Sequence, residues 1–531
     1  MKKRTIWLSL ALAVGQASHA FAQDASDALR YSRQQFGGPA RTLGIAGANV
    51  ALGADFGSLS SNPAGLGLFQ KSELHLTPGL GLGQGEGRME GSSSAAQTEN
   101  KNSFHIASAG LVLTGRKADT DQSSNWRGGS LAFGFTRTAD FNTASRYGAT
   151  LNERSIGGRT YTAAEQSYLA SLEGTAPPSY FSDIRRQSSA GDYETADALA
   201  YGAYLTNIVR SRNGSDSAIV MRRMRGPIGQ SESIVSRGSM SQFDIGYGAS
   251  YRDRLYIGAA LGIVSSNYRT TRSFTETETD PTTRLNSYTL RDDLSTSGRG
   301  VNLRVGAILR ASDFLRVGAS IQTPTFLSLT DTYNSRITTD FSAQGSDNSP
   351  ALPASVVGVT SVDALENIYD YNLTTPFRAN GGAALTIGKI GFLTGDVEYV
   401  GYNQARLSNA KGEANGDDYS FSKENSSIRS RYRSVVNLRF GGELRYDVFR
   451  VRAGYARYGD PYQTESSVNR IQSFYTAGAG LRQGSFFLDA AVMYQAFDQA
   501  YTPYTLSNGL EPLIKVNNNR YTTSITAGVT F

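Results

Sequence analysis

Apolar and polar residues alternate one by one along many segments of the chain, which is the pattern of a β-strand with two different faces. Between Tyr521 and Phe531 the odd positions are mostly apolar and the even positions are small or polar. One apolar and one polar face suit the wall of a membrane β-barrel, which meets lipid outside and a polar interior inside. This segment therefore predicts a barrel strand.

The alternation recurs in pairs of segments joined by very short turns, as in residues 243–251 and 255–263. About fourteen such segments are predicted, and bacterial single-chain barrels have an even number of strands. From the fourth segment onward, turns of about two to four residues alternate with loops of roughly fourteen to fifty, like periplasmic turns and extracellular loops. We expect an all-β, transmembrane antiparallel barrel over residues 72–531. Its predicted strands are residues 72–84, 102–114, 129–139, 240–251, 255–268, 300–310, 314–328, 377–388, 391–406, 434–445, 448–458, 473–481, 486–498 and 519–531.

Residues 140–239 interrupt this pattern with a long excursion between the third and fourth predicted strands, which the topology places outside the cell. Apolar residues from Ala196 to Ile208 recur at helical spacing, and a second, shorter helix is predicted over Ala163–Leu172. The apolar stripe of the first helix could pack on the barrel rim, or it could receive a hydrophobic ligand.

One face of the first predicted strand consists of glycines, at alternate positions from Gly79 to Gly87. Glycine inside a strand often marks a place where another backbone approaches closely. A flexible hairpin end is the alternative interpretation, and the pattern alone does not separate the two.

The N-terminal part of the chain does not alternate. Residues 1–22 have a basic start, a short apolar run and an Ala20-Phe21-Ala22 cleavage site, which together predict a signal peptide. Residues 23–71 are rich in Gly and Ala. Placed before the first strand, they could fold inside the lumen as a plug, where large side chains would not fit.

Composition agrees with a barrel. The chain has 57 Gly, 29 Tyr and 24 Phe but only 39% hydrophobic residues, and its mean hydropathy of −0.34 is expected when half of each strand faces a polar lumen. The formal charge is +6, of which the predicted signal peptide carries three positive charges. The remainder is spread along the chain, so we expect no nucleic-acid binding, which needs a basic patch.

The N-terminal segment resembles the hatch of the FadL-type long-chain fatty acid transporter family, which includes the TodX aromatic-hydrocarbon channels. The resemblance covers nearly the whole chain and implies a fourteen-stranded barrel with an N-terminal plug. It further implies diffusive uptake of hydrophobic molecules, with lateral release into the membrane through a gap beside an inward kink in the third strand. The matching stretches are Gly44–Leu52, Asn62-Pro63-Ala64-Gly65-Leu66, Thr323-Pro324, Thr375-Pro376 and Asp396-Val397-Glu398-Tyr399.

Two sets of residues take roles from this resemblance. The hatch motif is Asn62, Pro63, Ala64 and Gly65. The glycines in or next to the third predicted strand, which could permit the kink, are Gly128, Gly129 and Gly134. The polar insertion at 140–239 is the main departure from the family's pattern.

Charged side chains of the predicted strands point into the lumen by the same parity. An Arg at the lipid midplane would cost about 2–4 kcal/mol, so inward placement is expected. These residues could pair with one another or hold the plug, and an Arg among them could instead bind a ligand carboxylate through two parallel hydrogen bonds. They are Arg304, Arg316, Asp396, Glu398, Arg439, Glu443, Arg445, Arg450 and Arg452.

His75 and His105 are the histidines outside the predicted signal peptide, and the chain has 0 cysteines. Transition-metal and haem sites therefore lack their usual ligands, and we expect no metal and no cofactor. Ordinary hydrogen bonding in the lumen is the expected role of both histidines. An outer-membrane hydrolase would need one of them beside a nucleophile.

The leading functional hypothesis is a passive outer-membrane channel, not an enzyme, for hydrophobic compounds such as long-chain fatty acids or aromatic hydrocarbons. The alternatives are a structural or shuttle barrel like the PorV-like proteins of type IX secretion, and the hydrolase. We expect a monomer in the outer membrane of a Gram-negative cell. Its partners would be membrane lipid, a hydrophobic small molecule and the barrel-assembly machinery, which would recognise the terminal Phe531.

Overall fold

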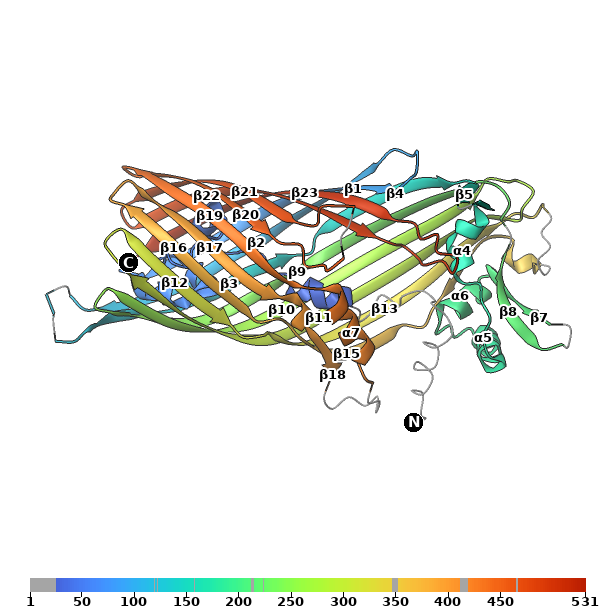
Figure 1. Ribbon diagram of the computed structural model, residues 1–531, viewed down its shortest axis with the longest axis horizontal. Coiled ribbons are helices and arrows are strands. Elements are labelled where there is room, and N and C mark those ends of the chain that lie inside the picture. The colour runs from blue at the N-terminus through green and yellow to red at the C-terminus, as the bar shows by residue number, and fades with distance from the viewer. Residues whose placement is uncertain are drawn as a thin grey trace.

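A computed structural model describes residues 25–531 except residues 119, 122, 157, 212–213, 223, 346–351, 411–418 and 465–466. The predicted signal peptide therefore lies outside the described residues. Antiparallel strands form one long cylinder, and several short helices lie at the end opposite the C-terminus (Figure 1). Pairing between β1 (Glu73–Met89) and β23 (Ile514–Thr530) closes the cylinder.

The barrel has fourteen antiparallel strands, so the predicted fold class is confirmed. Several of these strands are made of two or three segments separated by short breaks. Between β1 and β23 they are, in order, β2 (Gln97–Arg116), β3 with β4 (Trp126–Asp140, Thr143–Leu151), β9 (Ile228–Tyr251), β10 (Leu255–Glu278), β11 (Leu285–Arg310), β12 with β13 (Leu315–Gln322, Phe326–Phe341), β14 with β15 and β16 (Gly358–Asp363, Asn367–Thr374, Arg378–Ile387), β17 with β18 (Gly391–Gly401, Arg406–Asn409), β19 (Ser434–Tyr446), β20 (Phe449–Tyr458), β21 (Gln472–Gln483) and β22 (Phe486–Tyr501). Short helical segments between them are η4 (Ala354–Val356), η5 (Tyr402–Gln404) and α7 (Ser422–Arg431).

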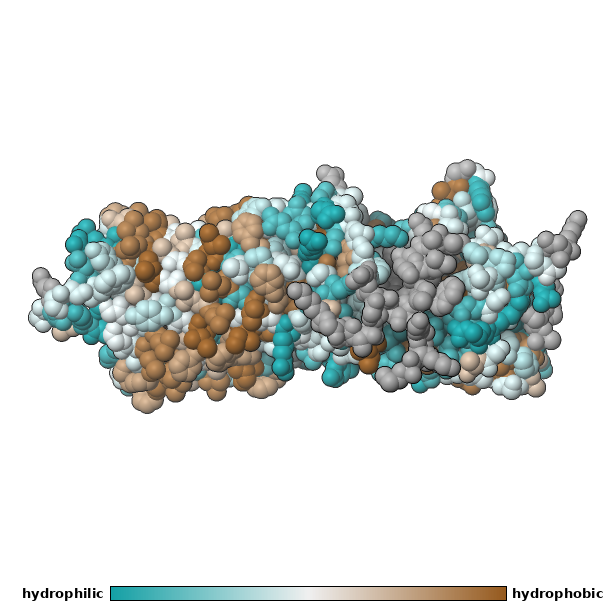
Figure 2. Space-filling model, turned by 90° about the horizontal axis from the view of Figure 1, so that it is seen from below, coloured by the Kyte–Doolittle hydropathy of each residue, from teal (hydrophilic) through white to brown (hydrophobic). Residues whose placement is uncertain are grey.

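An apolar belt covers the half of the barrel nearer the C-terminus on the face shown in Figure 2. Large hydrophobic side chains there point outward and are exposed, among them Leu261, Val305 and Phe440. Tyr475, Tyr494 and other outward tyrosines of β20 to β23 lie ring to ring between neighbouring strands, with centroids 4.8–6.3 Å apart. An apolar band with an aromatic girdle is the surface of a barrel that crosses a bilayer.

Among the described residues, no helix has the length and apolar character needed to cross a membrane.

The strands continue well beyond the belt into a polar half of the cylinder (Figure 2). Residues 269–299 were expected to form a loop, but β10 and β11 pair continuously and leave only residues 279–284 between them, so that prediction is wrong. The reason is that the outward positions of β10 after Ile263 are Ser265, Asn267 and Arg269. The apolar face ends where the wall leaves the lipid, although backbone pairing does not.

The excursion between the third and fourth strands is shorter than predicted, because residues 143–151 and 228–239 belong to β4 and β9. The predicted helix 163–172 is split in two, and Ile208, which we placed on a helical stripe, lies in a strand instead. The predicted apolar stripe does not continue to Ile208, because the helix that begins at Ala196 ends at Gly202, which lies against the ring of Tyr193. The excursion contains β5 (Arg154–Ile156), β6 (Arg159–Tyr161), η3 (Ala164–Gln166), α4 (Tyr168–Ser171), α5 (Pro178–Ala190), α6 (Ala196–Gly202), β7 (Thr206–Arg210) and β8 (Asp216–Met221).

Apolar residues of the excursion pack into the outer half of the barrel. Leu169 and Leu199 share one buried cluster with Phe274 and Tyr288 of the barrel wall. The backbone N–H of Tyr168 donates to the buried carboxylate of Glu276 at 3.1 Å. The outer half is therefore filled mainly by large apolar and aromatic side chains.

The N-terminal segment, residues 25–69, lies inside the barrel and is almost wholly buried. Its elements are α1 (Ala25–Ser32), α2 (Ala40–Gly44), α3 (Ser58–Ser61) and η2 (Pro63–Leu68). Glycines in the wall strands leave room for this segment. A Cβ on Gly248 would lie 2.6 Å from the carbonyl oxygen of Pro63, and a Cβ on Gly441 would lie 2.5 Å from the carbonyl oxygen of Ile45. Side chains at these wall positions would collide with the segment's backbone.

Candidate functional site

Asn62 joins the N-terminal segment to itself and to the wall. Its side-chain nitrogen donates to the carbonyl oxygens of Val50 (2.7 Å) and Ala307 (3.1 Å). Its side-chain oxygen accepts from the backbone N–H of Ala64 at 3.1 Å, which caps the 3-10 helix that begins at Pro63. Three of the residues that carry the hatch resemblance, Asn62, Pro63 and Ala64, thus take part in one contact point between β11 and the segment, and Gly65 follows within the same helix.

Charged wall residues bind the backbone of the segment directly. Arg304 and Arg316 donate to the carbonyl oxygens of Leu59 and Leu52, each at 2.8 Å. Asp396 accepts from the backbone N–H of Val50 at 3.0 Å. These predicted inward charges therefore hold peptide groups that would otherwise be buried without a partner.

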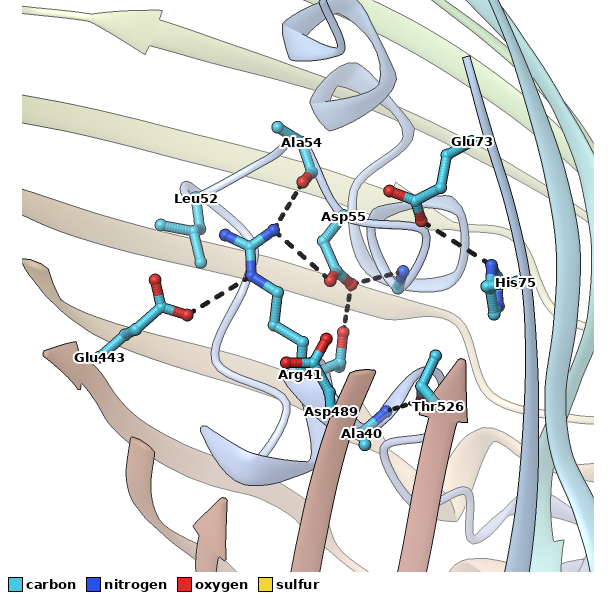
Figure 3. A network of polar contacts seen from close by, with 12 residues as sticks. Ala40, Arg41, Leu52, Ala54, Asp55, Glu73, His75, Glu443, Asp489 and Thr526 are labelled. Atoms are coloured by element: carbon cyan, nitrogen blue, oxygen red, sulfur yellow. Dashed lines mark hydrogen bonds and ion pairs between the residues drawn. The ribbon is translucent and has the colours of Figure 1, made fainter. Parts of the chain in front are cut away.

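A buried ion-pair network joins Arg41 of α2 to Glu443 of the wall (Figure 3). Glu443 bonds Arg452 at 2.7 Å and Arg445 at 2.8 Å, and Arg452 also bonds Asp489 at 2.7 Å. From the segment, Arg41 approaches Glu443 at 3.7 Å and donates to the carbonyl oxygen of Ala54 at 2.7 Å. The network joins three wall strands to the N-terminal segment.

A second network surrounds Glu398, which is bound by Arg439 at 2.7 Å and by Arg378 at 3.1 Å. Arg378 also donates to the carbonyl oxygen of Ser32 in α1. Among the described residues, Arg450 joins neither network and donates instead to the carbonyl oxygens of Asp447 and Phe449 at its own turn.

Sequence reasoning missed three members of these networks, namely Arg41, Arg378 and Asp489. Arg378 and Asp489 face the lumen by the parity that identified the other charges, so that signal could have found them. Arg41 lies outside any strand, so the alternation of faces along a strand does not predict where its side chain points.

A small, partly open cavity of about 50 Å³ lies between the segment and the wall. Arg304, Arg378 and Arg439 line it together with Asn49 and Tyr458. A cavity of this size holds one or a few water molecules. The space between the segment and the wall is therefore small at this level, and polar side chains form much of its lining.

The third strand is interrupted where it passes the N-terminal segment. β3 ends at Asp140 and β4 begins at Thr143. The register of β3 against β9 shifts between Arg137 and Ala139, and β4 continues the shifted register. On its other side β3 pairs with β2 only up to Thr136, opposite Ser108, and the next pair in the described residues is Gln97 with Arg146. Residues 98–107 of β2 therefore have no ladder partner on this side.

The missing ladder arises because the strand bends inward and lies over β1. A Cβ on Gly85 or Gly87 would overlap the carbonyl groups of Ala144 or Arg146 in β4. Of the two interpretations of the glycine face, the structure therefore supports close approach of another backbone. The glycines at which we expected the kink lie elsewhere: Gly134 pairs regularly with Gly110 and Asp244, and Gly128 and Gly129 are at the start of β3.

Both histidines lie on the inner side of the wall near this place. The imidazole Nε2 of His75 is 3.0 Å from the hydroxyl of Ser108, and its Nδ1 is 3.8 Å from the carboxylate of Glu73. The Phe56 ring of the N-terminal segment covers His75, with ring centroids 4.6 Å apart. Since His75 and Ser108 are buried, a substrate has no access to this arrangement in the described conformation.

Similarity of this chain to known proteins is found in comparisons of structure. No protein-family model matches the sequence, and no curated protein does so either. The chain is similar to the P. putida toluene transporter TodX, with a TM-score of 0.51 and 9% identity over 93% of this chain and 99% of that chain. It is also similar to a Pseudomonas aeruginosa FadL homologue, with a TM-score of 0.52 and 12% identity over 94% and 99%. The predicted fold family is confirmed: this chain has the fold of the FadL-type barrels.

Proposed function

We propose that the protein is a passive outer-membrane channel for hydrophobic compounds. Solute would enter from the outer half, pass the N-terminal segment after it shifts, and leave sideways into the membrane beside the third strand. The observation that carries this proposal is the interruption of the third strand next to a filled lumen, in a fold shared with a toluene transporter and a FadL homologue.

The contacts of residues 25–69 support a role as a hatch. The wall holds this segment through hydrogen bonds from Arg304 and Arg316 and through the carboxylate of Asp396. Water can replace such bonds at modest net cost, whereas an apolar core has no such substitute. A segment held in this way can shift without unfolding the wall.

The gap beside the third strand supports sideways exit. Phe104 and Ile106, on the unpaired stretch of β2, point outward and are exposed, so the gap lies within the apolar belt. A solute leaving there would enter lipid without crossing the polar networks below. The proposed partners are membrane lipid, the hydrophobic solute and the assembly machinery that would recognise Phe531. We also propose that the protein is a monomer in the outer membrane of a Gram-negative cell.

Flux into lipid vesicles tests the proposal. Purified protein is reconstituted into vesicles, and entry of toluene and of a fluorescent long-chain fatty acid is compared with entry of glucose. We expect the protein to accelerate the hydrophobic solutes and not glucose. Equal acceleration of all three would indicate an open pore, and no acceleration of any would contradict a channel function.

A further inference from the structure

An arginine patch lies on the outer surface of the barrel, beyond the apolar belt. It consists of Arg237 of β9, Arg269 of β10 and Arg299 of β11, three strands that lie side by side (Figure 1). Each side chain is exposed and lies on the outward face of its strand, the face that carries Phe243, Ile263 and Val301 within the belt. The wall therefore has a positively charged surface next to its lipid-facing part.

Two like charges of the arginine patch stand opposite each other. Arg237 and Arg269 are direct partners in the ladder between β9 and β10. Like charges at directly opposite positions are destabilising, because the Cβ atoms of such residues are only about 5 Å apart. An anion bound between the two guanidinium groups would remove this repulsion.

No carboxylate of the described residues forms an ion pair with an arginine of the patch. The carboxylates closest in register are those of Asp293 and Asp140, each two ladder positions away from an arginine of the patch. Asp293 is bound by Arg291 at 2.7 Å, and Asp140 by Arg137 at 3.3 Å. The arginine patch therefore remains available for an anion from outside the protein.

The arginines of the patch lie at two different heights above the belt. Arg299 is two residues from Val301, the last apolar outward residue of β11, which is about 7 Å along the strand. Arg269 is six residues from Ile263, the last apolar outward residue of β10, which is about 20 Å along the strand. With strands tilted by about 40°, these lengths correspond to about 5 Å and about 15 Å along the barrel axis.

These heights distinguish between the lipids that carry phosphate groups. The polar layer of a bilayer is about 5–8 Å thick on each side of the hydrocarbon core. The phosphate of a phospholipid therefore reaches the level of Arg299 but not the level of Arg237 and Arg269. A phosphate at the higher level must belong to a longer headgroup, such as a saccharide that carries several phosphates.

We propose that the arginine patch binds a glycolipid of the outer leaflet whose saccharide headgroup carries several phosphates. Arg299 binds a phosphate next to the hydrocarbon core, and Arg237 together with Arg269 binds a second phosphate further out along the saccharide. Arginine suits this role because its guanidinium group donates two parallel hydrogen bonds to a phosphate. The inference rests on the proposed location in the outer membrane, but it does not involve the lumen or transport.

Binding of two related lipids to the full-length protein in detergent micelles tests the proposal. One probe is lipopolysaccharide with a short, phosphorylated core saccharide, and the other is lipid A, which has the lipid phosphates but no core. Arg237→Gln/Arg269→Gln should weaken binding of lipopolysaccharide by about twenty-fivefold and change binding of lipid A by less than about twofold, because each arginine near charged headgroups contributes about a factor of five. Arg299→Gln should weaken binding of both probes by about fivefold.

The matched control is Arg159→Gln/Arg186→Gln, which removes the same charge from two exposed arginines that are already paired with Glu165 and Asp183. It should leave binding of both probes unchanged. Equal weakening of both probes by Arg237→Gln/Arg269→Gln would contradict the second phosphate. Unchanged lipopolysaccharide binding in every variant would overturn the whole patch. Phosphatidylglycerol that binds as tightly as lipopolysaccharide, with the same dependence on Arg237 and Arg269, would make the patch a phospholipid site and overturn the proposal.

The unaltered protein keeps the test decisive if a variant does not fold. Lipopolysaccharide without core phosphates should bind no more tightly than lipid A, and equal binding with and without these phosphates would contradict the proposal. Toluene flux should be the same in all variants, since the arginine patch lies outside the barrel. The predicted binding pattern in a protein that shows no flux at all would support the arginine patch and contradict the proposed channel function.

Discussion

The two halves of the barrel are filled in different ways. In the membrane half, small residues of the N-terminal segment lie against wall glycines and are held by arginines and carboxylates. In the outer half, the excursion is held by a core of large side chains such as Leu169, Phe274 and Tyr288. The difference supports the proposal that the N-terminal segment is the part that moves, because polar contacts exchange readily with water, while burial of large apolar side chains resists opening.

The largest expected effect is in the outer half. Phe274→Ala removes a fully buried aromatic ring and should lower the free energy of unfolding by about 3–5 kcal/mol. Urea titration of the protein folded in vesicles measures the change, and protease should then cut within residues 152–227. If the excursion remains protected and stability is unchanged, it is not anchored by this core.

Arg452→Leu tests the ion-pair network of the membrane half. It leaves Glu443 and Asp489 without this cation, and we expect a loss of about 3 kcal/mol of stability. Arg450→Leu is the matched control, because the neighbouring Arg450 bonds only its own turn among the contacts described. It should change stability by less than about 0.5 kcal/mol. Equal losses in the two variants would mean that the network does not hold the lumen.

Asn62→Ala should have a smaller, local effect. Two carbonyl oxygens, those of Val50 and Ala307, lose their donor, which costs about 1–2 kcal/mol. Hydrogen exchange should quicken in residues 50–66 and stay unchanged in the outer half. Faster exchange in both halves would contradict the separation drawn between them.

The smallest effect is expected from His75→Gln. The amide can keep a hydrogen bond with Ser108, so toluene flux should stay within about twofold of the unaltered protein. Hydrolysis of a lipid ester by the unaltered protein that disappears in this variant would instead revive the hydrolase hypothesis.

The alternation of apolar and polar residues predicts the wall strands within the lipid, where their outward face must be apolar. It does not predict the parts of the strands that extend beyond the lipid. The strands around Ile263 and Val305 were found this way, while the outer part of β10 was missed because its outward face is polar. Parity also placed Arg304, Arg316 and Asp396 toward the lumen. It could not tell that they bind backbone groups of the N-terminal segment, because that segment follows no period and its path depends on wall glycines far away in sequence.

The bend in the third strand was expected at glycines of that strand, and it lies instead at Asp140 to Thr143. The position of the bend is not decided by the flexibility of the third strand. It is decided by the space along the glycine face of β1 and by the hydrogen bonds from Arg520, which belong to other strands. Such contacts cannot be derived from the composition of the bent strand itself.

Tethering the N-terminal segment to the wall tests most directly whether the lumen opens by its movement. Thr526 of β23 accepts from the backbone N–H of Ala40 at 2.7 Å, so Ala40→Cys/Thr526→Cys introduces a thiol at each of two residues that touch, in a chain without other cysteines. Toluene flux into vesicles is then measured before and after oxidation. We predict that oxidation abolishes flux and that reduction restores it. Unchanged flux through the tethered protein would contradict passage past this segment.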